Sequence, residues 1–439
     1  MRKKKNAFTL IELLAVIVIL AVILVISIPR ILDVIETSKK DSFKSTAQLI
    51  ADSAEKKYVE NKLNNIDEEI TCENVTKLSK EDYESCKITF DSEGNAKVSI
   101  TGKGKFDGLK ITNGTKENAE VIEITKPTYG MKATEYITNL LEYNGEGLKK
   151  DNTPDQNIRY YGSNPNNYVL FNNELWRIIG VFGSNVKLIR NEKLGNLSWD
   201  SSESSINRGY GVNEWSQADL KNYLNTMYYE GTSVTCYNEK NNQTTTCPAN
   251  KLDETSKSLI DNHTWNIGAI DKTDTTIVNP ETFAINTVSF YKAERGTTNG
   301  KICNGRDACN DTVTRTTEWT GYIGLPYPTD YAYASSESDC ETNMNAGDID
   351  FDNGIFNMTC KKNNWMHHGT TMEIEDATWF MSPVADPDYA ANVWYVLGGG
   401  LTNDSCAAYP FSAFPTIYLK SNIIIESGKG TSSDPYILK

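Results

Sequence analysis

Hydrophobic residues are concentrated in one run near the start of the chain. Residues 8–28 are almost all Val, Ile, Leu and Ala, with Thr9 and Ser27 as mild exceptions and Glu12 as the sole charge. A helix of this length is roughly 31 Å long, which matches the hydrocarbon core of a bilayer. A carboxylate within such a run costs about 2.5–3.5 kcal/mol on insertion scales, so Glu12 requires a partner or a purpose. The run therefore predicts a membrane-spanning helix with one functional acidic residue.

The hydrophobic pattern becomes periodic after Pro29. Apolar residues recur three or four positions apart and form one stripe, while charged residues occupy the other positions; the stripe consists of Phe43, Ala47, Ile50, Ala54 and Tyr58. This spacing predicts that the helix continues to about residue 63 and packs its stripe against a sheet. The alternative is a separate soluble helix joined by a linker at Pro29.

Alternating apolar and polar positions between residues 70 and 125 predict short strands. Residues 86–90 and 96–100 flank a turn rich in Asp, Gly and Asn, the pattern of a β-hairpin. Residues 106–112 and 119–124 predict two more strands. The expected fold class is α+β: a long N-terminal helix, half membrane and half amphipathic, packed on a small antiparallel sheet.

The remaining chain is expected to form a linker and a second domain. Residues 126–150 read as a linker that contains a short helix at 133–143. Residues 151–439 are expected to form a large β-rich α+β module, with strands and one helix; the strands are at 168–171, 174–182, 186–190, 377–383, 393–396 and 414–419, and the helix is at 218–225.

The charge balance of the chain disfavours nucleic acid as a partner. The formal net charge is −14, and loss of residues 1–7, which carry four cations, would change it to −18. Such a surface repels phosphate backbones, so no direct nucleic-acid binding is expected. The 23 tyrosines and 8 tryptophans are compatible with carbohydrate or host-surface recognition by the C-terminal module, but most of them are expected to build a β-rich core.

The nine cysteines predict a disulfide-bonded extracellular protein. They show no CxxC spacing and fall into four local couples, which are Cys72 with Cys86, Cys236 with Cys247, Cys303 with Cys309, and Cys340 with Cys360. A 15-residue loop such as 72–86 gains about 3 kcal/mol in the chain-entropy model. Cys406 is left over, either as a buried thiol or as a partner under another pairing, because sequence does not fix the connectivity.

One acidic segment is a calcium candidate. Asp348, Asp350 and Asp352 occupy alternate positions before Gly354, as in a calcium loop. The glycine lies one place late for an EF-hand, however, and no glutamate follows at the twelfth position. The same alternation is typical of a half-buried strand with one polar face. Apart from calcium, no cofactor is expected.

The sequence contains little that points to catalysis. It has three histidines, His263, His367 and His368, and of these the His-His-Gly segment could bind a metal or act as a base. It has no nucleophile elbow, phosphate loop or HExxH motif. The chain is therefore not expected to be an enzyme.

The residues around the start of the apolar run resemble a known family. Arg2 to Lys5 form a basic flank that stays in the cytoplasm and directs the rest of the chain outward. The sequence Lys5-Asn6-Ala7-Phe8-Thr9-Leu10-Ile11-Glu12-Leu13-Leu14 is similar to the N-terminus of type IV prepilins and pseudopilins, with their N-terminal methylation motif. The resemblance covers about 30 residues of the chain.

That resemblance assigns roles to individual residues. It implies that a membrane aspartyl protease, the prepilin peptidase, removes the leader 1–7 between Ala7 and Phe8, and that the new amine of Phe8 is methylated. Glu12 and Pro29 match the family's assembly glutamate and its helix-kinking proline. The family usually has Gly where this chain has Ala7, which implies less efficient processing. Physically, the Phe8 amine or a neighbouring subunit's amine can neutralise Glu12, which lies one helical turn away.

A second resemblance concerns the C-terminal module. Trp176-Arg177-Ile178-Ile179, the helix at 218–225, Trp379 to Pro383 and Pro415 to Leu419 follow the order of an uncharacterised bacterial surface and phage-associated domain. That domain is distantly similar to the C-type-lectin-like fold of formylglycine-generating enzymes. No function is established for it, so the resemblance implies no chemistry.

The combined expectation is a minor, tip-located pilin. Residues 8–28 would hold the subunit in the cytoplasmic membrane before assembly and then bind other pilin subunits, residues 29–125 would form the pilin-like domain, and residues 151–439 would be displayed on an extracellular pilus. Three alternatives remain, namely a major pilin with a large exposed domain, a pseudopilin of a secretion or DNA-uptake system, and a membrane-anchored surface enzyme.

Overall fold

The computed structural model describes residues 10–145, 147–202, 211–237, 244–296, 313–350, 355–368, 377–386 and 391–439. Within these ranges it does not describe the side chains of Glu12, Ile26, Asp350, Ile355 and Phe356. The chain divides into two compact units, and each is described by itself. The N-terminal unit comprises Met1–Lys126 and Glu142–Asn144, and the C-terminal unit comprises Pro127–Leu141 and Gly145–Lys439.

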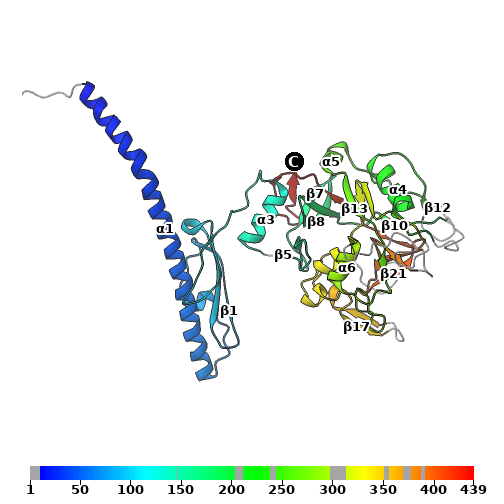
Figure 1. Cartoon of the computed structure of the whole chain (residues 1–439), viewed down its shortest axis with the longest axis horizontal. Coiled ribbons are helices and arrows are strands. Elements are labelled where there is room, and N and C mark those ends of the chain that lie inside the picture. Colours follow the sequence, from blue (N-terminus) through cyan, green and yellow to red (C-terminus); the bar gives the residue numbers. More distant parts are fainter. Residues whose placement is uncertain are drawn as a thin grey trace, which may run out of the picture. The chain divides into compact units, whose positions relative to one another are not determined.

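The N-terminal unit is built on one continuous helix, α1 (Leu10–Asn64) (Figure 1). Pro29 lies inside α1, although it has no N–H to donate to the preceding turn. The expectation of one helix through Pro29 is therefore confirmed, and the alternative of a linker at this position is wrong. The first half of α1 extends beyond the sheet, whereas the second half lies along it (Figure 1).

A four-stranded antiparallel sheet covers the second half of α1, in the strand order β1-β2-β3-β4. The elements of this part are α2 (Cys72–Val75), β1 (Tyr83–Phe90), β2 (Ala96–Gly102), the 3₁₀ helix η1 (Gly104–Phe106), β3 (Leu109–Gly114) and β4 (Ile122–Glu123). The predicted hairpin is present, with Cys86 opposite Ile100 and Phe90 opposite Ala96.

The apolar stripe of α1 forms the core of the N-terminal unit. Phe43, Ala47, Ile50 and Ala54 are fully buried, and Tyr58 is half-buried and stacks on Phe90 with ring centroids 4.7 Å apart. This burial is the favourable term that holds a helix of this length against a small sheet.

The C-terminal unit contains short helices and two large sheets. Its helices are α3 (Ala133–Tyr143), η2 (Trp215–Gln217), α4 (Asp219–Asn222), the π-helix η3 (Tyr223–Tyr229), α5 (Glu254–Leu259), α6 (Thr287–Glu294), α8 (Pro328–Ala334), η4 (Ser338–Glu341) and η5 (Thr359–Lys361). The helix predicted at 218–225 corresponds to α4 and the start of η3.

The larger sheet has nine strands, in the order β16-β23-β9-β8-β7-β25-β24, with β6 on β8 and β5 on β6. Its strands are β5 (Leu148–Lys150), β6 (Ile158–Tyr160), β7 (Tyr168–Phe171), β8 (Glu174–Phe182), β9 (Asn185–Arg190), β16 (Ile323–Gly324), β23 (Thr416–Tyr418), β24 (Ile425–Ser427) and β25 (Tyr436–Leu438). Asn172 and Asn173 join β7 to β8 with φ of 56° each, the conformation that a tight hairpin turn requires.

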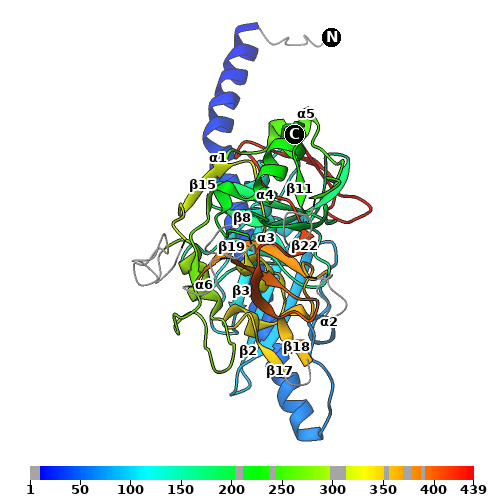
Figure 2. The same ribbon diagram turned by 90° about the vertical axis from the view of Figure 1, so that its right-hand side faces the viewer.

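The smaller sheet has six strands, in the order β10-β22-β19-β20-β21, with β14 on β19. Its strands are β10 (Gly195–Ser198), β14 (Ile270–Asp271), β19 (Thr378–Ala385), β20 (Asn392–Val396), β21 (Thr402–Cys406) and β22 (Pro410–Ala413). Three further strand pairs are β11 (Cys236–Tyr237) with β12 (Thr244–Thr245), β13 (His263–Asn266) with β15 (Glu318–Gly321), and β17 (Gly347–Asp350) with β18 (Ile355–Met358). Figure 2 shows β17 beside β18.

One core joins these elements, and five tryptophans are fully buried in it, namely Trp176, Trp199, Trp215, Trp265 and Trp379. The predicted α+β class is confirmed. The expected linker differs from the structure, because β5 pairs with β6 and Ala133, Ile137 and Leu148 are buried in this core. Most of residues 126–150 therefore belong to the C-terminal unit.

Candidate functional site

The first half of α1 is the largest exposed apolar surface on the described residues. Every large hydrophobic side chain described between Leu10 and Val25 is 47–83 % exposed. By length and composition α1 can cross a membrane. Ala7 and Phe8 lie outside the described residues, and Glu12 lies on α1 with an undescribed side chain. An apolar surface this large requires lipid or another protein to cover it.

The second half of α1 carries a further apolar ridge that the sequence analysis missed. Leu49, Val59 and Leu63 are 56 %, 55 % and 79 % exposed. Leu63 follows the buried Ala54 by nine residues, or two and a half turns, so it points away from the sheet. Leu49 precedes Leu63 by about four full turns and shares its face. The spacing of these residues in the sequence could have identified this second apolar face. We call Leu49, Val59 and Leu63 the outer ridge.

Three of the four expected cysteine couples are disulfides in the structure, namely Cys72–Cys86, Cys236–Cys247 and Cys340–Cys360. They close short loops within single units, as their spacing suggests. The fourth expected couple is not confirmed, because Cys303 and Cys309 both lie outside the described residues. A disulfide between Cys303 and Cys309 therefore stays a prediction. Cys406 is half-buried at the end of β21, opposite Asn392.

The calcium candidate falls on the hairpin of β17 and β18. Asp348 and Asp350 lie on β17, opposite Asn357 and Ile355 of the partner strand β18. The alternative interpretation of the acidic segment as a strand therefore agrees with the position of these two residues. Asp352 lies outside the described residues. No group of three or more acidic, histidine or cysteine side chains among the described residues is arranged to hold a metal ion. The calcium site stays a prediction.

A group of four buried charges lies between the large sheet and α8, and we call it the buried ion cluster. It consists of Asp151, Arg159, Lys187 and Asp330, whose side chains are at most 1 % exposed. Arg159 Nε donates to Asp151 Oδ2 at 2.8 Å, and Arg159 Nη1 donates to Asp330 Oδ1 at 2.6 Å. Lys187 Nζ donates to Asp330 Oδ2 at 2.5 Å. The four charges therefore alternate in sign, from Asp151 to Arg159, then to Asp330 and then to Lys187.

Burial and pairing compete within the buried ion cluster. Burial lowers the pKa of Lys187 to about 8, against the raising effect of Asp330. Burial raises the pKa of Asp330, but the charges of Lys187 and Arg159 outweigh it and hold this pKa below its usual value. Nearby, burial raises the pKa of Glu294 to about 7, against the lowering effect of Arg295.

The arrangement of the cluster fits a structural role. Its four side chains are closed off from solvent, and Lys187 lies over the rings of Tyr327 and Tyr418 at 4.3 and 5.3 Å from their centroids. These residues were not predicted from the sequence, because their partners are far apart in the chain. One signal was present in the sequence: Lys187 lies within the apolar segment that forms the buried strand β9. A charge at such a position requires a buried partner.

The histidines lie in separate places. His263 Nδ1 is 3.2 Å from Asp261 Oδ2, and its ring stacks on Tyr418 with centroids 3.7 Å apart. Burial lowers the pKa of His263, so its neutral form is favoured. His367 Nδ1 is 3.1 Å from the hydroxyl of Tyr331. Among the described residues, neither ring belongs to a group of three or more acidic, histidine or cysteine side chains that could hold a metal ion.

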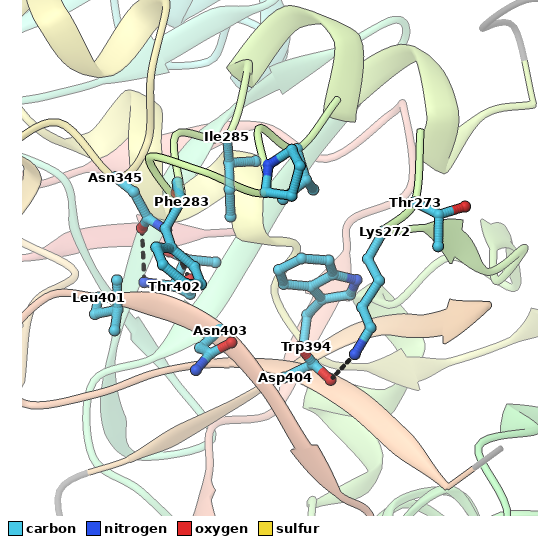
Figure 3. A pocket seen from close by; sticks show the side chains of 12 residues that line it. Lys272, Thr273, Phe283, Ile285, Asn345, Trp394, Leu401, Thr402, Asn403 and Asp404 are labelled. Carbon is cyan, nitrogen blue, oxygen red and sulfur yellow. Dashed lines mark hydrogen bonds and ion pairs between the residues drawn. The ribbon is translucent and has the colours of Figure 1, made fainter. Parts of the chain in front are cut away.

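A cavity of about 480 Å³ opens in the C-terminal unit between the loop that follows β14 and strands β20 and β21 (Figure 3). Its wall is largely apolar, and its polar side chains include Lys272 and Asp404. A volume of this size is typical of small-molecule sites.

Comparisons with known proteins support the N-terminal assignment. The family described as "Prokaryotic N-terminal methylation motif" matches residues 2–28. No curated protein and no solved structure matches the chain. The resemblance of the C-terminal module to the lectin-like fold of formylglycine-generating enzymes is not supported. The motif implies processing by a prepilin peptidase and assembly with other pilins, and it suggests a structural protein. It supports, in general terms, a protein of the type IV pilin-like or pseudopilin-like kind.

Proposed function

We propose that this chain is a minor, tip-located subunit of a type IV pilus that displays its C-terminal unit outside the cell. The observation that carries this proposal is the size of the C-terminal unit, which has its own buried core across Pro127–Leu141 and Gly145–Lys439. A unit of this size would be hard to repeat along a closely packed shaft, whereas one copy at a tip meets no such restriction.

Assembly would bury the exposed surface of α1. Its first half would leave the lipid and pack against the same half of neighbouring subunits, which removes its apolar side chains from contact with lipid or water. The outer ridge, Leu49, Val59 and Leu63, would extend this contact along the second half. Glu12 would pair with the amine of a processed Phe8 and fix the stagger between subunits, because an unpaired carboxylate is costly in an apolar bundle.

The first experiment is the intact mass and N-terminal sequence of the protein from its native cells. A terminus at Phe8 with one added methyl group is the expected result. A terminus at Met1 would contradict the proposal, and the C-terminal unit would then belong to a membrane-anchored surface protein or enzyme.

The second experiment tests the role of Glu12. Glu12→Val should leave cleavage normal and prevent incorporation into filaments. Glu93→Val is the control, because Glu93 is an exposed carboxylate in the turn between β1 and β2, outside α1 and its outer ridge, and its filaments should be normal. Normal incorporation of the Glu12→Val subunit would refute the assigned role.

The third experiment locates the subunit. Gold-labelled antibody against the C-terminal unit should mark filament ends, and mass spectrometry of purified filaments should find far fewer copies than of the most abundant pilin. Labelling along the whole shaft would favour a major pilin. Loss of secretion or DNA uptake on deletion, without labelled filaments, would favour a pseudopilin.

A further inference from the structure

The cavity in the C-terminal unit has an apolar wall with one polar side. Its apolar lining consists of Val278, Pro280, Phe283, Ile285, Trp394 and Leu401. Ile285, Trp394 and Leu401 are almost completely buried and form the inner part of the wall, while Phe283 is 43 % exposed. Figure 3 shows these side chains around the opening.

The loop that carries Phe283 is held in place by hydrogen bonds. Asn279 N donates to Ala284 O at 2.8 Å, and Phe283 N donates to Asn279 O at 2.9 Å. Asn345 Nδ2 donates to Phe283 O at 3.0 Å and to Thr402 O at 2.9 Å, which ties the loop to β21. The cavity is therefore preformed, and a ligand does not have to order it.

Phe283 itself has a φ of +57°, which is costly for a bulky residue. The surrounding bonds enforce this conformation, and the ring remains exposed beside the cavity. Strained residues of this kind cluster at ligand sites.

The polar side of the cavity carries one lining ammonium, Lys272, that is already paired with carboxylates. Lys272 Nζ lies 3.1 Å from Asp386 Oδ2 and 3.3 Å from Asp404 Oδ2, so one ammonium faces two carboxylates. Asn392 Nδ2 donates to the same Asp404 Oδ2 at 2.6 Å. Asp404 Oδ1 has no hydrogen-bond partner among the described residues, which leaves one acceptor available at the cavity.

The aromatic side chains of the wall also favour a positively charged ligand. The faces of indole and phenyl rings carry partial negative charge and attract cations. Trp394 packs edge-to-face on Phe290, with centroids 5.1 Å apart, and this contact fixes its orientation in the wall.

From this combination we infer that the cavity binds a small organic cation whose body is aromatic or branched aliphatic. The body would fill the apolar wall, and its ammonium would bind Asp404 Oδ1. An anionic ligand would meet Asp404 on a chain of net charge −14, and the one lining ammonium, Lys272, is already paired. A sugar would leave its hydroxyl groups unpaired against Val278, Ile285 and Leu401. The inference does not depend on the role of the chain in a pilus.

The test uses tryptamine as the probe and indole-3-propionate as its anionic counterpart, titrated by calorimetry into the full-length chain in phosphatidylcholine nanodiscs. Empty nanodiscs provide the blank. Tryptamine should bind saturably and at least about tenfold more tightly than indole-3-propionate, which corresponds to about 1.4 kcal/mol. Equal affinity of the two probes, or no saturable binding of tryptamine, would overturn the inference.

Two substitutions locate the site. Asp404→Asn keeps the shape of the side chain and removes its charge, so it should weaken tryptamine binding about tenfold and abolish the preference over indole-3-propionate. Asp339→Asn is the matched control, since Asp339 is exposed and does not line the cavity. Unchanged binding by Asp404→Asn, or equal losses in both variants, would place any tryptamine binding elsewhere and overturn the inference.

Discussion

Asp330→Asn tests whether the buried ion cluster holds the C-terminal unit together. Asp330 is the shared partner of Arg159 and Lys187, with one carboxylate oxygen for each. Asparagine has nearly the same shape but no charge, so both cations would remain buried, Arg159 with Asp151 as its partner and Lys187 without the carboxylate that pairs with it. Breaking a buried ion pair from one side costs about 3–5 kcal/mol. At about 2 °C per kcal/mol for a unit of this size, the melting temperature should fall by roughly 6–10 °C.

The effect of Asp330→Asn should depend on pH in a defined direction. In the wild-type protein the pKa of Lys187 is lowered to about 8, and loss of Asp330 removes a charge that raises it. In the variant the pKa of Lys187 therefore lies below about 8, and its protonated form at low pH destabilises the native state more than in the wild type. Above about pH 8 the native lysine is neutral in both proteins, and this part of the difference disappears. Arg159 remains charged throughout, so the destabilisation shrinks with rising pH but does not vanish.

The assay is urea unfolding of the full-length chain followed by tryptophan fluorescence between pH 6 and 9. All eight tryptophans lie in the C-terminal unit, so the signal reports its unfolding. Asp339→Asn is the control for loss of one surface charge and should change stability by less than about 0.5 kcal/mol. A loss below about 1 kcal/mol for Asp330→Asn, or a loss that grows with pH, would refute this account of the cluster.

Single contacts give three further predictions. Phe43→Ala should destabilise the N-terminal unit by about 3–5 kcal/mol through loss of its central aromatic residue, measured by hydrogen exchange; native-like protection would contradict this. Replacing Cys72 and Cys86 together by Ser should cost about 3 kcal/mol in the same measurement, and reductant should then have little further effect on this unit. Glu294→Gln should gain stability over the wild type as pH rises from about 5 to 8, because the native pKa of Glu294 is raised to about 7 and its ionisation is penalised; a pH-independent difference in urea unfolding would argue against it.

The periodic segments were predictable because local pattern determines them. The stripe from Phe43 to Ala54 predicted the face of α1 that packs on the sheet, and the alternation around the turn at 91–95 predicted the hairpin between β1 and β2. Both rest on interactions within a few residues along the chain. The segment 126–150 was misjudged as a linker, because its partners lie elsewhere in the sequence, for example Ile423, whose carbonyl accepts a hydrogen bond from Ala133 N.

The ion pairs of the buried ion cluster and of the cavity could not be predicted from local sequence patterns. Lys187 and Asp330 are 143 positions apart, and Lys272 and Asp404 are 132 apart, so no local pattern could pair them. The sequence by itself determined the membrane-length helix with its methylation motif and the class of the fold, and it indicated three local cysteine couples, because each depends on composition or on neighbours in the chain. The tertiary structure alone decided which charges are buried together and where the cavity opens, since these depend on contacts that exist only after distant strands have paired.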